Sequence, residues 1–280
     1  MATTLSTGLT DLLPSIIAEA SFQAQERSIM RNLVKNYAIS AGTGKTVNVP
    51  TWANETATTL TEGTALTADT LSTTSATLTV AEVGVMATVT DLAMRTSSAN
   101  VIADAGTILG SAVATKMDKD LLGLFAGFTT VVGNGVINAS AAHVFEAIAR
   151  LRKQGVSGND IVCVVHPYIA YDLKSGVSNA FAGTASDTSN EAMRTGYIGT
   201  LAGVAIYESA NVTDASGVSV GAVFHKDALG LAMLNDISIE PSRDAALRGT
   251  SLICTATYGF GELTDLYGVG MNFDSSLTIA

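Results

Sequence analysis

The chain has few charged side chains, and it has no long apolar run. Charged residues make up 14% of its 280 residues, while hydrophobic residues make up 47%. This charge content is low for a free-standing monomer, so we expect partners to cover much of the surface. No apolar run approaches the roughly 20 residues needed to span a bilayer, and no membrane partner is expected.

Cysteine and histidine are scarce as well. Cys163 and Cys254 lie far apart and belong to no C-x-x-C pair, which excludes a disulfide framework and the usual zinc spacing. His143, His166 and His225 are dispersed and form no metal-binding pair with one another. We therefore expect no metal and no cofactor.

Basic residues are outnumbered, with 15 Lys and Arg against 25 Asp and Glu and a net charge of −10. A protein that binds nucleic acid through its phosphates normally carries a basic surface. The balance therefore argues against sequence-specific or tight DNA binding.

Three short motifs resemble enzyme sites but lack the required context. "GTGKT" ends like a phosphate-binding loop, yet Ile39 stands at the first-glycine position and a strand pattern, "TVNVPT", follows Lys45. "GVSVG" places Ser219 as in a nucleophile elbow, but a strand pattern follows and no histidine occurs after His225. Asp118 and Asp120 are interpreted as solvated charges on a helix. We predict that the chain is not an enzyme.

The first half of the chain predicts long, extended elements. A helix is expected over Asp11–Lys35, followed by strands over Thr46–Thr51 and Ala76–Thr90 with a polar connection of over twenty residues between them. The apolar alternation changes phase near Ala81, which predicts a bend or bulge. A long amphipathic helix is expected over Asn100–Phe128.

Glycines punctuate the helix and the later strands. Gly106 and Gly110 lie inside the predicted helix, where we expect them to allow close approach of another backbone. From Gly133 the pattern is α/β: the helix "AAHVFEAIARLRKQG" ending at Gly155, the buried strand "IVCVVHP", the helix "PYIAYDLKSG" and several strands. "GFGELT" among these strands predicts a bend.

The order of these segments resembles a known family. The resemblance is carried by "GKTVNVP" leading into "LTEGTALT", by "EVGVMATVTDLAMRTS", by "GYIGTLAGVAIYESANV", and by "AVFHKDALGLAM" followed by "IEPSRDAALRGTSLICTATYGFGELTDLYGVGMN". On these residues the chain resembles the major capsid proteins of tailed bacteriophages, with the Hong Kong 97 type fold, over nearly its whole length.

The resemblance implies an α+β fold and a division of the chain into five segments. These are an N-terminal arm (1–40), an extended β-hairpin loop (41–90), a peripheral domain with a long spine helix (91–132), an α/β axial domain (133–234) and closing strands (235–280). Intersubunit contacts are expected from the extended loop, at Leu60, Glu62, Leu66 and Leu71. No lysine occurs between Lys45 and Lys116, so the covalent loop crosslink of some members is not expected.

The resemblance also implies a function and partners. Copies are expected to self-assemble in the cytoplasm of a bacterial host, as pentamers and hexamers of an icosahedral head shell that encloses double-stranded DNA in the virion. A portal protein, a possible decoration protein and a separate scaffolding protein are expected partners, unless the chain is a processed product that has lost its own scaffolding segment. The alternative is an encapsulin-type compartment shell, and a P-loop or serine-hydrolase enzyme is a remote one.

Overall fold

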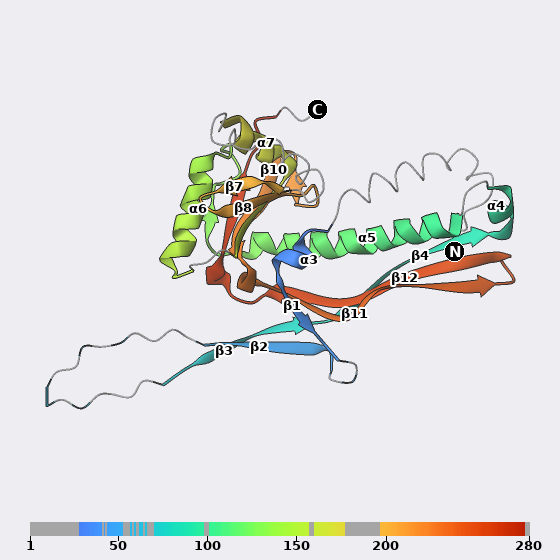
Figure 1. The fold of residues 1–280 in the computed structure, drawn as a ribbon, viewed down its shortest axis with the longest axis horizontal. Helices are drawn as coiled ribbons and strands as arrows, with labels where there is room; N and C mark the ends of the chain where they lie inside the picture. The colour runs from blue at the N-terminus through green and yellow to red at the C-terminus, as the bar shows by residue number, and fades with distance from the viewer. Residues whose placement is uncertain are drawn as a thin grey trace.

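The computed structural model has a compact part, an elongated part and a projecting ribbon (Figure 1). The residues that the structure describes are 28–40, 42, 44–52, 57, 59, 62–63, 65, 70–97, 101–156, 160–176 and 197–277. The compact part is built on a seven-stranded sheet, the elongated part on a four-stranded sheet, and the ribbon is a separate two-stranded sheet.

The elongated part is a long hairpin flanked by a strand on each side. Its strands, in sheet order, are β1 (Lys35–Ala38), β11 (Leu229–Asp244), β12 (Gly249–Glu262) and β4 (Ala81–Thr90). β1 pairs parallel with β11, and the other pairs are antiparallel. The 234/235 boundary expected from the sequence falls inside β11, and the division of the chain into domains stays a prediction.

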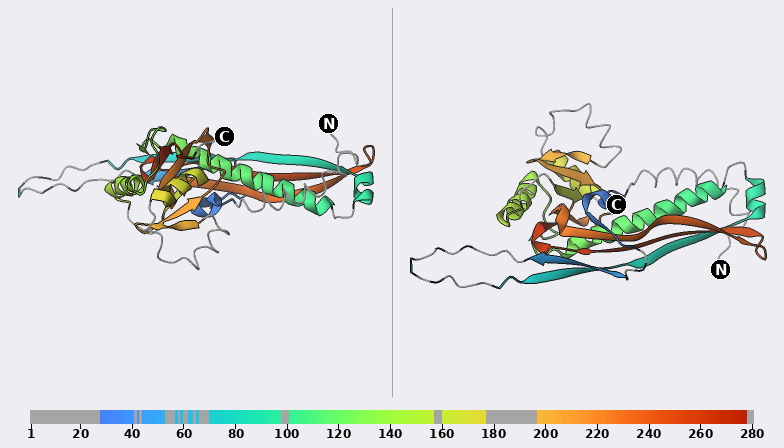
Figure 2. Two further views of the ribbon diagram at one scale, coloured as in Figure 1. Left: turned by 90° about the horizontal axis from the view of Figure 1, so that it is seen from above. Right: turned by 60° about the horizontal axis from the view of Figure 1, so that its bottom comes forward.

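One long helix lies along this sheet (Figures 1 and 2). Helix α5 (Val101–Gly123) continues into the 3-10 turn η1 (Leu124–Gly127), as expected for Asn100–Phe128. Its residues Leu109, Val113, Met117 and Leu121 recur every four positions and are buried in the main core. This apolar stripe is the local reason that α5 forms and faces the sheet.

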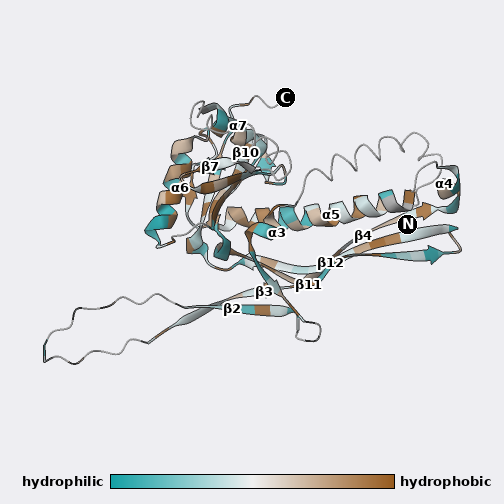
Figure 3. Ribbon diagram, viewed as in Figure 1, coloured by the Kyte–Doolittle hydropathy of each residue, from teal (hydrophilic) through white to brown (hydrophobic). Residues whose placement is uncertain are grey.

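The compact part contains a second sheet and two helices. Its strands are β5 (Val131–Val132), β13 (Gly268–Phe273), β10 (Val218–His225), β6 (Ile161–Val165), β8 (Val204–Glu208) and β7 (Tyr197–Leu201), in that order, with β9 (Asp214–Ala215) beside β10. Helices α6 (Ala141–Lys153) and α7 (Pro167–Gly176) lie beside this sheet. Figure 3 shows hydrophobic residues concentrated in this part and along α5, with few on the ribbon.

The ribbon consists of β2 (Thr46–Trp52) and β3 (Thr73–Thr79). They pair in one unbroken antiparallel register, from Thr46 opposite Thr79 to Trp52 opposite Thr73. The chain leaves the ribbon at Val80, whose N–H donates to the Lys45 carbonyl at 2.9 Å, and then enters β4 in the other sheet. The predicted bend near Ala81 is confirmed, because the phase change marks this transfer between sheets.

The helix expected over Asp11–Lys35 is wrong at its C-terminal end. Helix α3 (Met30–Leu33) is only four residues long, and Lys35 begins β1. The edge of β11 supplies strand partners, Gly230 for Lys35 through Met233 for Ala38, and this pairing overrides the helical pattern. The part of this expectation before residue 28 lies outside the described residues.

Of two expectations for glycines, the one for the helix is wrong within the subunit. A Cβ on Gly106 or Gly110 would lie 3.7 or 4.0 Å from Ile239 Cδ1, so these glycines meet a side chain at ordinary contact distance and no close backbone. The bend expected at "GFGELT" is confirmed at its C-terminal end, where β12 ends at Glu262 and the chain bends at Leu263. Gly259 and Gly261 lie before this bend and pair regularly inside β12 with Ala232 and Gly230. They permit close approach of the ribbon base, where a Cβ on Gly259 would lie 2.4 Å from the Thr79 carbonyl oxygen.

Candidate assembly surfaces

The contact residues predicted from the sequence belong to the segment between β2 and β3. Leu60 and Leu66 lie outside the described residues, whereas Glu62 and Leu71 are both exposed, Leu71 by 67%. The structure adds Trp52, which is 64% exposed at the end of β2. The sequence offered a signal for it, because this is the only tryptophan in the chain and it ends an alternating strand.

The ribbon has no core of its own in its outer half. Of its residues only Leu78, at the base, is buried, where it packs with Ile39, Val80 and Ala232. In the described part of the chain neither edge of the ribbon pairs with another strand. A two-stranded ribbon is marginally stable alone in water, so its outer half is suited to packing against another molecule.

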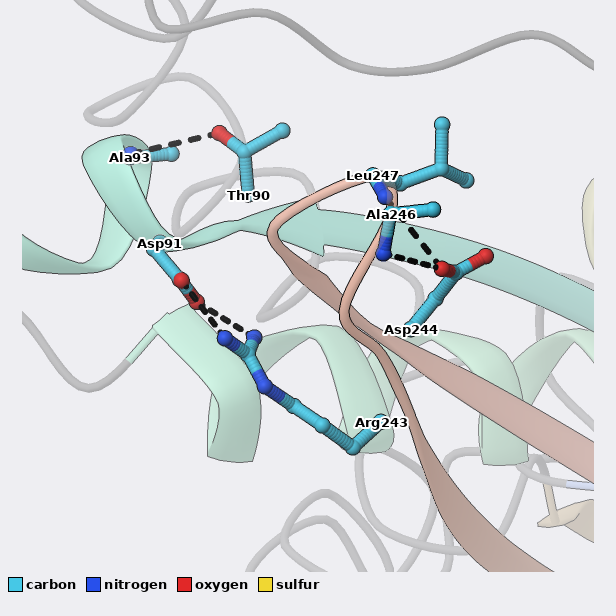
Figure 4. Close-up of polar contacts among 7 residues, drawn as sticks. All are labelled: Thr90, Asp91, Ala93, Arg243, Asp244, Ala246 and Leu247. Atoms are coloured by element: carbon cyan, nitrogen blue, oxygen red, sulfur yellow. Dashed lines mark hydrogen bonds and ion pairs between the residues drawn. The ribbon is translucent and has the colours of Figure 1, made fainter.

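The distal tip of the elongated part is held by its own polar contacts (Figure 4). Arg243 donates two hydrogen bonds to Asp91, at 2.5 and 2.7 Å, and this contact lowers the pKa of the Asp91 carboxyl. Asp244 accepts from the amides of Ala246 and Leu247 in the turn between β11 and β12. Thr90 caps helix α4 (Asp91–Thr96) by accepting from the Ala93 amide.

Exposed apolar side chains lie at this fixed tip and on the strand β4 that leads to it. Leu92 is 59% exposed and Met86 is 56% exposed, and both lie on the elements that the polar contacts hold. The tip therefore offers apolar surface in a defined geometry, which favours packing against another chain.

Asp118 is not the solvated charge that the sequence suggested. Its side chain is fully buried, and it accepts hydrogen bonds from the Met30 amide at 2.9 Å, the Ser28 hydroxyl at 3.1 Å and the Asn211 side-chain amide at 3.1 Å. Burial raises the pKa of Asp118, and these donors partly offset that rise. Helical spacing could not reveal these partners, which are about ninety positions away on either side. Asp120 also has partners, since it accepts from the Tyr258 hydroxyl and pairs with Lys116.

Two ion pairs fix the segment that follows Met30. Arg31 donates to both oxygens of Asp236 on β11, at 3.0 and 2.8 Å, and Lys35 pairs with Asp227 at 2.8 Å. Together with Asp118 of α5, these two carboxylates in and just before β11 hold residues 28–35. We call residues 28–38 the docked arm.

The enzyme-like motifs are placed in structural contexts that do not suit catalysis. Ser219 lies within β10, opposite Phe273, and is fully buried, whereas a nucleophile elbow needs a strand-to-helix turn. Lys45 precedes strand β2, whereas a phosphate loop needs a helix N-terminus there. Across the described ranges no three His, Cys, Asp or Glu residues lie close enough to bind a metal ion. No helix within those ranges is long and apolar enough to cross a membrane.

Comparisons with known proteins agree with this architecture. Residues 73–269 match a family model described as phage capsid protein. A search of curated proteins found no significant match.

Solved structures with a similar fold come from phages. A structure from Mycobacterium phage Che8 is 22% identical with a TM-score of 0.69, covering 87% of this chain and 90% of that one. The capsid structure of Cyanophage P-SCSP1u is 18% identical with a TM-score of 0.69, covering 89% and 88%. The capsid of Ralstonia phage GP4 is 11% identical with a TM-score of 0.71, also covering 89% and 88%. At these identities the likeness shows a shared fold.

Proposed function

The chain belongs to the phage capsid protein family, and from this premise we propose that it is the major capsid protein of a tailed bacteriophage. The observation that carries the proposal is the family match over residues 73–269, which spans part of the ribbon, the elongated part and most of the compact part. Many copies of the chain form the head shell, and the function is structural and not enzymatic.

The shape of the subunit supports a shell made by self-assembly. The outer ribbon has no core of its own, and both Leu92 at the distal tip and Met86 on β4 are exposed to solvent. Both features are unfavourable in an isolated subunit and become favourable when a neighbouring copy covers them. We infer that pentamers and hexamers of the chain close into an icosahedral shell.

We propose that the ribbon makes the contact between neighbouring subunits. Leu60, Glu62, Leu66 and Leu71 are proposed to contact the next copy. Trp52 joins this set because it is exposed at the end of β2, where the connecting segment begins. Full burial of a leucine contributes roughly 1.5 to 3 kcal/mol. This contact therefore bears on shell stability more than on the folding of the subunit.

Trp52 offers a direct spectroscopic test of the ribbon contact. As the only tryptophan in the chain, it should shift its emission to shorter wavelength and become less accessible to acrylamide when shells form. A matched test is the Trp52→Phe variant, which should abolish the signal and leave assembly intact. Equal quenching in free subunits and in shells would contradict the ribbon contact.

The acidic balance suits a lumen that holds packaged DNA. A net charge of −10 repels phosphates, which lets double-stranded DNA be packed without adhering to the wall. A portal protein, a scaffolding protein and a possible decoration protein complete the proposed set of partners, with assembly in the cytoplasm of the bacterial host. An encapsulin-type shell, the alternative, is not favoured by the family match to phage capsid proteins.

Electron microscopy of the purified chain, produced with its scaffolding protein, tests the proposal. Closed shells or rings of five and six subunits are the expected result. A species of only 28.7 kDa at micromolar concentration under those conditions would overturn it. Protein cargo in place of DNA in natural particles would favour the encapsulin alternative.

A further inference from the structure

The buried carboxylate of Asp118 touches three separate regions of the chain. It projects from α5 in the elongated part, accepts from Ser28 and Met30 in the docked arm, and accepts from Asn211 in the segment between β8 and β9 of the compact part. No metal-like or catalytic arrangement surrounds it among the described residues. Its partners are all donors from the chain itself.

The two oxygens of Asp118 divide these partners. Oδ1 accepts from the Ser28 hydroxyl and the Met30 amide, while Oδ2 accepts from the Asn211 side-chain amide. One oxygen therefore faces the arm, and the other faces the compact part. Because the carboxylate is rigid and planar, a change in the position of one partner changes the hydrogen-bond geometry of the other.

Apolar side chains surround Asp118, and their packing depends less on angle than its hydrogen bonds do. Met30 and Val34 of the arm are buried in the same core as Met117 and Leu121 of α5 and Phe224 of β10. Apolar contacts tolerate small shifts when volume is conserved, whereas hydrogen bonds weaken steeply with angle. Asp118 thus makes directional contacts to both the arm and the compact part, within a core that is otherwise mostly apolar.

We propose that Asp118 couples docking of the arm to the orientation of the compact part on the elongated part. It is a positioning residue: when the arm is docked, the compact part takes a single orientation on the elongated part. Shells made from such subunits therefore have a uniform curvature. This inference rests on the proposed function, since it needs the chain to form shells.

Three variants separate this role from simple stabilisation. Asp118→Ala removes both oxygens. Asp118→Asn keeps an oxygen that accepts from the arm. If the Asn211 amide rotates, its oxygen can accept from the new Nδ2 at position 118, so this variant should retain both contacts and behave like the wild type. Asn211→Ala cuts only the link to the compact part. Asp104→Ala removes a half-exposed carboxylate from the same helix and serves as the matched control.

Hydrogen exchange at the Met30 amide and particle diameters from electron microscopy are the two readouts. In Asp118→Ala, Met30 protection should fall by at least about tenfold, and particle diameters should spread. Asn211→Ala should keep Met30 protected and still broaden the diameters, a combination that simple arm anchoring would not produce. Asp118→Asn and Asp104→Ala should match the wild type in both.

The outcomes that overturn the inference are distinct from failure of the proposed function. If wild-type chains form no shells, the proposed function fails. If wild-type shells form and Asn211→Ala shells are equally uniform, the coupling through Asp118 is wrong. Should Asp118→Ala not fold, Asn211→Ala and the Asp118→Asn rescue still decide the question, because each leaves the arm contacts in place.

Discussion

Replacing Gly259 by alanine should push the base of the ribbon off the sheet. Gly259 lies in β12, and a Cβ there would be 2.4 Å from the Thr79 carbonyl oxygen, 2.7 Å from the Thr79 carbonyl carbon and 3.0 Å from the Val80 nitrogen. All three are backbone atoms, so no flexible side chain can move aside. Either β12 or the ribbon base must shift.

The cost follows from the packing around this point. Overpacking a close contact costs about 1 to 3 kcal/mol, and the shift also disturbs Leu78, which is fully buried beside Gly261 and Gly230. Loss of part of the burial of one leucine adds about 1 kcal/mol. The lower entropy of alanine in the unfolded chain returns about 0.4 to 1 kcal/mol. We expect the free energy of unfolding to fall by about 1 to 3.5 kcal/mol.

Urea unfolding of unassembled subunits measures this change as a lower midpoint with an unchanged slope. Gly123→Ala is the matched control, because nothing lies within 4 Å of a Cβ there and Gly123 ends α5. That control should be neutral or stabilising by up to about 1 kcal/mol. A Gly259→Ala subunit as stable as the control would refute the argument that this glycine exists for close approach.

Three further predictions follow from the glycines, the titratable groups and the ribbon. Gly110→Ala should stabilise the free subunit by up to about 1 kcal/mol, since a Cβ meets only Ile239 at 4.0 Å. A lower subunit melting temperature would contradict this. A stable subunit that assembles poorly would show that Gly110 allows the backbone of a neighbouring copy to approach. Burial, and then a hydrogen bond with Asp265, raises the pKa of Glu262 to about 7. The unfolded carboxyl titrates near 4.3, so the wild type loses stability relative to Glu262→Gln as pH rises from about 4.5 to 7. The loss is on the order of 1 kcal/mol after screening at this partly exposed site. Urea unfolding at pH 5 and pH 8 should show that the difference in unfolding free energy between variant and wild type increases, and an unchanged difference would count against this pKa shift. Deletion of residues 56–74 should leave the subunit melting temperature nearly unchanged and lower that of particles, because loop shortening costs a subunit little; an equal loss in both would mean that the segment stabilises the subunit itself.

Local periodicity in the sequence determined several elements of this protein. Apolar residues four positions apart predicted α5, and the phase change after Val80 located the transfer of the chain from ribbon to sheet. Gly155 ended helix α6 as expected, with a positive φ of 81° just after Lys153. These features depend on neighbours within a few residues, which the sequence displays directly.

Contacts between distant residues were decided only by the tertiary structure. The parallel pairing of β1 with β11 turned the end of an expected helix into a strand. Asp118 is buried because Met30 and Asn211, about ninety positions away on either side, supply its donors. Gly259 is required by Thr79, which reaches it from another sheet. Such partners share no local pattern, so only the packing of the whole chain brings them together and gives each side chain its environment.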